Sequence, residues 1–121
     1  MVSGPKLPIV KSDATLERAI VEMSSKGMGM TAVVDAAGRV AGIFTDGDLR
    51  RCIDRVTDIR KSAVVDVMTR TPRTIAPGQL AIDCVDAMEA APKVTQLLVV
   101  DARGVLVGAL HLHDLFRARV V

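Results

Sequence analysis

The sequence predicts a mixed α/β fold of two β-α-β-β-α repeats that pack sheet to sheet with pseudo-two-fold symmetry. First, residues 31–51 align with residues 97–117 at an offset of 66, and nine of the 21 positions are identical. Second, each half carries a stretch of helical spacing followed by two apolar runs of strand length. Third, the length of 121 residues gives two halves that are each too small to form a stable core alone.

The first half opens with an extended stretch and an amphipathic helix. The extended stretch covers residues 7–10, where Pro8 limits the backbone. The helix covers residues 13–26, whose apolar side chains follow helical spacing: Leu16, Ala19, Ile20 and Met23. Asp13 is the predicted N-cap of this helix, and Gly27 is its predicted stop.

A hairpin and a second helix complete the first half. Residues 30–34 and 40–44 are the predicted strands, and they flank a turn at 35–38 in which Gly38 tolerates a positive φ. The second helix covers residues 46–54 and begins with an acidic first turn, which the helix dipole favours.

The second half repeats this order. Its predicted elements are a strand at 73–76, a helix at 79–91, strands at 96–100 and 105–110, and a helix from Leu112. A linker at 59–68 ends in a short helix at 64–68. We therefore place the first motif at residues 1–58, and the linker with the second motif at residues 59–121.

The composition excludes several functions. A net charge of +2 and only two aromatic residues, Phe44 and Phe116, do not fit a nucleic-acid-binding protein, which needs basic patches or stacking rings. No apolar run approaches the ~20 residues of a membrane span, and the N-terminus lacks a signal-peptide core. Cys52 and Cys84 form no CxxC pair, so we expect packed thiols in a reduced, cytoplasmic protein.

The candidate binding residues lie where the second hairpin strand meets the second helix. Asp48 can accept charge-assisted hydrogen bonds from ribose hydroxyls, with the Thr45 hydroxyl and Asp46 beside it. The free N–H groups of the helix favour a phosphate. These groups together describe a nucleotide cleft, and the alternative is that Asp48 only caps the helix.

The second repeat offers equivalent groups. Asp114 corresponds to Asp48, and His111 takes the place of Thr45, with His113 on the same face of an extended backbone. His111 and His113 with Asp114 make an incomplete metal site, so we predict no metal. A role as cleft histidines or surface histidines stays open.

Further basic and polar residues are candidates for phosphate contacts. Arg51 and its repeat equivalent Arg117 can bind phosphate bidentately, as can their neighbours Arg50 and Arg119, or they can simply face solvent. Lys11 precedes the first helix and can contact a phosphate. Thr69 and Arg70 precede the first strand of the second repeat and can line a cleft.

The residues after the second hairpin strand resemble the CBS (cystathionine β-synthase) domain family. Its pattern there is Gly, two apolar residues, Thr or Ser, two variable residues and Asp. Residues 42–48 (GIFTDGD) fit the pattern fully, whereas residues 108–114 (GALHLHD) depart at His111. The resemblance covers nearly the whole chain and implies tandem CBS motifs.

Three segments resemble more narrowly the C-terminal CBS region of D-arabinose 5-phosphate isomerases: GMTAVVD at 29–35, GIFTDGDLRR at 42–51 and HLHDL at 111–115. Those enzymes interconvert D-arabinose 5-phosphate and D-ribulose 5-phosphate for Kdo and lipopolysaccharide synthesis. The resemblance implies that the chemistry lies in a preceding sugar-isomerase (SIS) domain. We expect this chain to lack that domain and the lead-in segment of its first motif.

The resemblance therefore implies a regulatory module with no required cofactor. Its expected ligand is a nucleotide-type effector, either an adenine nucleotide (AMP, ADP or ATP) or the pathway product CMP-Kdo. The expected partners are a second copy, forming a homodimer through the CBS pairs, and the SIS domain of the parent chain. The alternative is a structural oligomerisation module without a ligand. An enzyme in its own right is not expected, because no nucleophile–base pair or complete metal set is visible.

Overall fold

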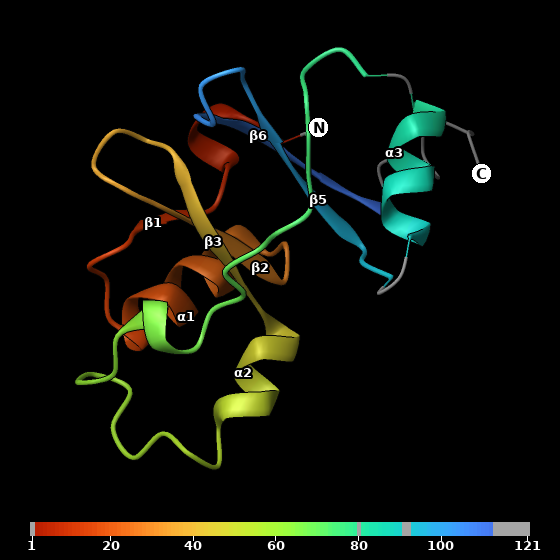
Figure 1. The fold of residues 1–121 in the computed structure, drawn as a ribbon. Coiled ribbons are helices and arrows are strands. Elements are labelled where there is room, and N and C mark those ends of the chain that lie inside the picture. Colours follow the sequence, from red (N-terminus) through yellow and green to blue (C-terminus); the bar gives the residue numbers. More distant parts are fainter. Residues whose placement is uncertain (1, 80, 91–92, 113–121) are drawn as a thin grey trace.

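A computed structural model describes residues 2–79, 81–90 and 93–112 of the chain. The structure has two three-stranded sheets, and Figure 1 shows how the helices lie around the strands. The strands are β1 (Ile9–Lys11), β2 (Met30–Val34), β3 (Val40–Thr45), β4 (Thr74–Ile75), β5 (Gln96–Val100) and β6 (Leu106–His111). The helices are α1 (Leu16–Lys26), α2 (Asp46–Cys52) and α3 (Ala81–Glu89), with 3-10 turns η1 (Gly4–Lys6) and η2 (Val64–Asp66).

The two sheets have the same topology, which confirms the predicted mixed fold of two repeats. The order is β1-β2-β3 in one sheet and β4-β5-β6 in the other, each with a parallel pair followed by an antiparallel hairpin. Even the register irregularity recurs at the repeat offset, between Val33 and Val34 in β2 and between Val99 and Val100 in β5. The hairpin strands match the predicted ranges within one residue.

The N-cap prediction for the first helix is wrong. Thr15 caps α1, and its hydroxyl accepts a hydrogen bond from the backbone N–H of Arg18 at 3.2 Å. The linker explains this start, because the N–H groups of Leu16 and Glu17 donate to carbonyls at Ser62 and Ile59. The predicted stop is confirmed, since Gly27 ends the helix at φ 70° and donates to the Met23 carbonyl.

The remaining boundaries shift modestly. Helix α2 ends at Cys52 instead of residue 54, and the strand predicted at 73–76 has two residues. The short helix predicted at 64–68 is the three-residue 3-10 turn η2, and the helix predicted at 79–91 is described over Ala81–Glu89. The helix predicted from Leu112 onward lies, apart from Leu112 itself, outside the described residues.

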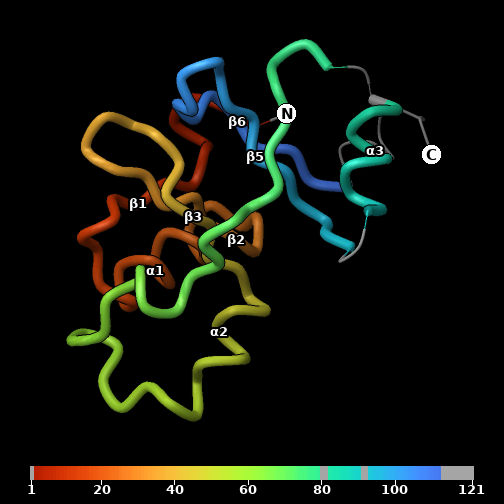
Figure 2. Tube along the Cα trace, in the orientation of Figure 1, coloured from red at the N-terminus to blue at the C-terminus, as the bar shows by residue number. Residues whose placement is uncertain are grey.

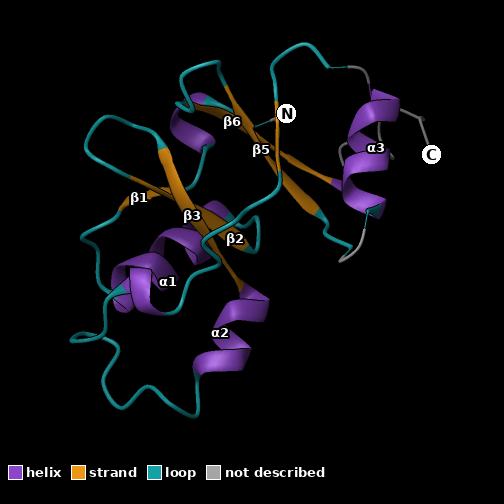
Figure 3. Ribbon diagram, in the orientation of Figure 1, coloured by secondary structure: helices purple, strands orange, loops and turns teal. Residues whose placement is uncertain are grey.

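The core forms three layers of contact, and Figure 3 shows the strands between the helices. Alternate side chains of each strand face opposite layers, as the pleat requires. The contact between the two sheets is made by Leu7, Met30, Ala32, Ile43, Leu98 and Ala109. Helices α1 and α2 cover the outer face of the first sheet, with Val33 and Phe44, and α3 covers the second, with Leu97 and Val99. None of the helices in the described ranges combines the length and apolar character that crossing a bilayer requires.

In each repeat, the segment before the first strand pairs with the hairpin of the other repeat. Val2, before β1, pairs with Ala109 in β6, and Thr69, before β4, pairs with Ile43 in β3. Figure 2 shows both crossings, with the N-terminal end beside β6 and the connecting segment passing β3. The hairpin turns also meet, because Val40 N–H donates to the Gly104 carbonyl. Each half therefore supplies backbone hydrogen bonds to the hairpin of the other half.

Gly42 makes the crossing over β3 possible. A Cβ atom at this position would lie 2.6 Å from the backbone oxygen of Thr69 and 2.7 Å from the Met68 sulfur. A side chain at residue 42 would therefore force the backbone of the connecting segment to move. The glycine at the start of the sequence motif is therefore required by the close approach of the connecting segment.

We expect Gly42→Ala to lower the free energy of unfolding by about 1–3 kcal/mol, because the new methyl group overpacks the crossing. Urea denaturation measures this. Gly47→Ala is the matched control, because a Cβ there meets only the flexible tip of Arg51 and the Thr45 hydroxyl, at 3.2 Å or more. The explanation fails if the two variants lose equal stability.

Glu22 joins α1 to the edge strand β1. Its carboxylate is buried and accepts hydrogen bonds from the Ile9 backbone N–H at 3.1 Å and from Lys26 Nζ at 2.7 Å, with Arg18 at 3.8 Å. Burial raises the pKa of Glu22, but these hydrogen bonds and the charges of Lys26 and Arg18 outweigh burial and hold the pKa below its ordinary 4.5.

We therefore expect Glu22 to make the stability pH-dependent. Because folding lowers its pKa, the stabilising contribution is fully present above about 4.5 and is lost as the pH falls through the folded-state value. The stability difference between wild type and Glu22→Gln should be large at pH 7 and shrink towards pH 3, as measured by urea denaturation. Glu17→Gln, on the exposed face of α1, is the control. A difference that does not change with pH would contradict this role.

Candidate functional site

The junction of β3 and α2 forms a capping box around Thr45 and Asp48. The Thr45 hydroxyl accepts a hydrogen bond from the Asp48 backbone N–H at 3.2 Å. Asp48 Oδ2 accepts from the Thr45 backbone N–H at 3.0 Å and from the Thr45 hydroxyl at 3.1 Å. The two residues thereby satisfy groups that a helix start leaves unpaired, and the spacing from the threonine to the aspartate is what makes this possible.

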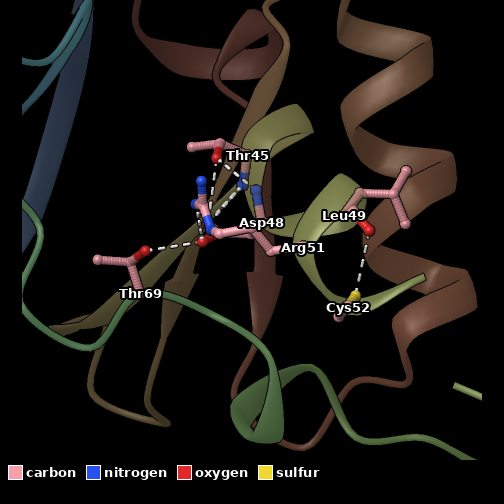
Figure 4. A network of polar contacts seen from close by, with 6 residues as sticks. All are labelled: Thr45, Asp48, Leu49, Arg51, Cys52 and Thr69. Carbon is pink, nitrogen blue, oxygen red and sulfur yellow. Dashed lines mark hydrogen bonds and ion pairs between the residues drawn. The ribbon is translucent and has the colours of Figure 1, made fainter. Parts of the chain in front are cut away.

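The other oxygen of Asp48 binds two residues from further along the chain. Asp48 Oδ1 accepts hydrogen bonds from Arg51 at 2.7 Å and from the Thr69 hydroxyl at 2.9 Å, as Figure 4 shows. Asp48 itself is only 5% exposed. This carboxylate therefore links the start of α2 to the segment that connects the repeats.

A cleft of about 660 Å³ lies beside this junction, between the two repeats. Its volume is within the range of small-molecule sites. The first repeat and the connecting segment contribute Met28, Gly29, Ile43, Thr45, Asp46, Gly47, Arg50, Arg51, Thr69, Thr71, Pro72 and Arg73. The second repeat contributes Lys93, Val94, Thr95, Gln96 and His111.

The lining of the cleft is cationic. Arg50, Arg51, Arg73 and Lys93 face it, and Asp46 is the acidic residue among the lining positions. Arg73 donates to the carbonyls of Ala87 and Ala90 at the end of α3. Among the described residues, Arg50 has no ion pair. The charge balance favours an anionic ligand.

The structure brings together some of the predicted site residues but not all. Thr45, Asp46, Arg51, Thr69 and His111 line the cleft. Asp48 lies behind this lining, held by its four hydrogen bonds.

Two predicted residues lie elsewhere, and three are not described. Lys11 ends β1 and does not line the cleft, and the Arg70 guanidinium donates to the Val65 carbonyl outside the cleft. His113, Asp114 and Arg117 lie outside the described residues. In the part of the chain that is described, no group of three or more His, Cys, Asp and Glu side chains is placed to hold a metal ion.

Sequence reasoning missed several lining residues. Arg73 and Lys93 enter the cleft from segments that flank β4 and β5. The repeat offset could have found others, because it maps the lining residues Met28 and Gly29 onto Val94 and Thr95, which also line the cleft. No comparable signal marks Arg73.

The cysteines are packed thiols outside the cleft. Both are buried and free, and the Cys52 thiol donates to the Leu49 carbonyl at 3.4 Å (Figure 4). Burial raises the pKa of the Cys84 thiol, and the nearby Asp83 carboxylate adds to this effect. Cys84 therefore stays protonated and weakly nucleophilic at neutral pH.

Known proteins with similar sequences share this repeat over its full length. The chain is 47% identical over 118 residues to "Arabinose 5-phosphate isomerase KdsD" of Pseudomonas aeruginosa, which covers 98% of the chain and 36% of the relative. The KdsD protein of Yersinia pestis is 42% identical over 121 residues, again 36% of the relative. The chain thus spans about a third of the length of these curated relatives.

Solved structures share the fold. A crystal structure of CBSX2 in complex with AMP has a TM-score of 0.81 at 24% identity, covering 99% of this chain and 92% of that one. The CBS domain protein PAE2072 from Pyrobaculum aerophilum, complexed with AMP, has a TM-score of 0.80 at 17% identity, covering 89% and 82%. The family model for the CBS domain matches residues 2–55 and 64–121. These matches, one over each repeat, show that the chain belongs to the CBS domain family as a pair of CBS motifs.

Proposed function

We propose that this chain is the ligand-sensing regulatory CBS pair of an arabinose 5-phosphate isomerase and binds a nucleotide-type effector in the cleft between its repeats. The observation that carries the proposal is the cationic cleft beside the Thr45 and Asp48 junction. Binding modulates an SIS isomerase domain in the parent protein, because a ligand shifts an equilibrium by its differential affinity for the two states.

The cleft offers partners for the phosphate and the ribose of a nucleotide. Arg50 and Arg51 on α2 and Arg73 supply cations for a phosphate. Thr45 and the carboxylate of Asp48 behind it supply donors and acceptors for ribose hydroxyls. By repeat symmetry, the proposal extends to His113, Asp114 and Arg117, but not to Lys11 and Arg70, which lie away from the cleft.

Two ligands fit this chemistry. Adenine nucleotides are supported by the AMP complexes of CBSX2 and PAE2072. CMP-Kdo is supported by the similarity to KdsD isomerases, since a product made downstream is a natural feedback signal. CMP-Kdo carries ribose hydroxyls, a phosphodiester and a carboxylate, so it also suits a cleft with several cations.

The role of the parent protein follows from the same similarity. We propose a cytoplasmic homodimer that associates through its CBS pairs and carries the isomerase chemistry outside this chain. The curated relatives extend well beyond the part that matches, which leaves room for such a domain in them. The chain itself is proposed to have no isomerase activity.

A structural oligomerisation module is the second candidate. It is favoured by the four hydrogen bonds of Asp48, which are all made within the protein. In that case Asp48 is only a helix cap and the cleft has no physiological ligand.

Thermal denaturation distinguishes the two candidates. A ligand that binds the native state must stabilise it, by about 2.7 kcal/mol at one hundred times its Kd. We expect AMP or CMP-Kdo at millimolar concentration to raise the midpoint of unfolding. An unchanged midpoint with both ligands, together with a dimer in sedimentation, would favour the oligomerisation module.

Asp48→Asn tests the assigned site. Loss of the charge weakens hydrogen bonds from ligand hydroxyls, and hydrogen bonds to charged groups contribute about 1.5–3 kcal/mol, so we expect affinity to fall about tenfold or more. Calorimetric titration with AMP and CMP-Kdo measures this. Asp35→Asn is the matched control, because Asp35 also accepts backbone hydrogen bonds in a turn but lies outside the cleft. Equal affinity in wild type and Asp48→Asn would contradict the assignment.

A further inference from the structure

The carboxylate of Asp48 has no vacant acceptor position. Oδ2 accepts two hydrogen bonds from Thr45, and Oδ1 accepts one each from Arg51 and Thr69. Two carboxylate oxygens offer about four acceptor positions in total. Because Asp48 is also buried, a ligand hydroxyl can bond to it only by replacing one of these donors.

We propose that Arg51 and Thr69 compete with the ligand for Asp48, and that this competition sets the affinity of the cleft and selects ligands carrying both vicinal hydroxyls and a phosphate. This inference rests on the proposed function. All three donor residues line the cleft, but the donors from Thr45 belong to the capping box and stay in place, whereas Arg51 and Thr69 lie outside the capping box.

Arg51 is the reason why the ligand needs both vicinal hydroxyls and a phosphate. Its side chain is 67% exposed, so it can turn towards the cleft with little desolvation. Moving its guanidinium away from Asp48 removes a 2.7 Å ion pair from a buried carboxylate, which is costly unless both charges gain new partners. A ligand phosphate accepts the guanidinium, and ligand hydroxyls take its place on the carboxylate. A ligand with only one of these groups leaves one charge unpaired.

Thr69 can release Asp48 by rotating its side chain alone. Its backbone is fixed to Ile43 by two hydrogen bonds, at 2.8 and 2.9 Å, which do not involve the hydroxyl. Removing the hydroxyl therefore frees a position on Asp48 Oδ1 and leaves the crossing intact. The competition predicts that this loss strengthens ligand binding, whereas a direct ligand contact by the hydroxyl predicts the reverse.

The test compares variants of Thr69 in calorimetric titrations with AMP and CMP, which share a ribose 5-phosphate. We expect Thr69→Val to bind about threefold to tenfold more tightly than wild type, the equivalent of one hydrogen bond. Thr69→Ser keeps the competing hydroxyl and should bind like wild type. Thr74→Val, an exposed position on β4 outside the cleft, controls for the substitution itself. A thermal melt without ligand verifies that each variant is folded.

The wild-type chain provides a second measurement that does not depend on any variant. Adenosine lacks the phosphate and 2′-deoxy-AMP lacks one hydroxyl, so each should bind at least tenfold more weakly than AMP. Equal affinity for the three ligands, or Thr69→Val binding no more tightly than wild type, would overturn the competition while leaving nucleotide binding intact. No binding of AMP, CMP or CMP-Kdo to the wild-type chain would overturn the proposed function and this inference with it.

Discussion

The pairing of β3 with the connecting segment at Thr69 is the interaction on which the rest of the structure depends. Two backbone hydrogen bonds join Ile43 and Thr69, and they bring the start of the second repeat onto the sheet of the first. Gly42 leaves the space for this crossing. The same crossing places the Thr69 hydroxyl on Asp48 and passes the chain along the cleft. The fold and the candidate site therefore both depend on the crossing of the connecting segment over β3.

The sequence was most informative where local chemistry decides the structure. The hairpins follow from strand-length apolar runs around a turn that contains Gly38 or Gly104, both of which adopt φ 82°. The end of α1 follows from Gly27. The capping box follows from the spacing between Thr45 and Asp48, which was predicted both as a ligand site and as a helix cap.

Prediction failed where distant segments decide between local options. Asp13 and Thr15 are both suitable N-caps, and the choice of Thr15 is made by linker carbonyls that bind the first turn of α1. The hydrogen bond between Thr69 and Asp48 joins residues 21 positions apart, and no pattern in their local sequence predicts it. Arg73 likewise reaches the cleft through the packing of distant segments, which its local sequence does not indicate. The roles of Asp114 and Arg117, and the motif boundary after residue 58, stay predictions.

The crossed pairing of the two repeats has a consequence for how the chain folds. Val2 pairs with Ala109, so a segment before the first strand of one repeat has to wait for the last hairpin strand of the other. Contacts of such sequence separation raise the contact order and slow folding. The first sheet likewise lacks its crossing partner until Thr69 has been synthesised. The pair therefore completes its fold after translation of both repeats, as one cooperative unit and not motif by motif.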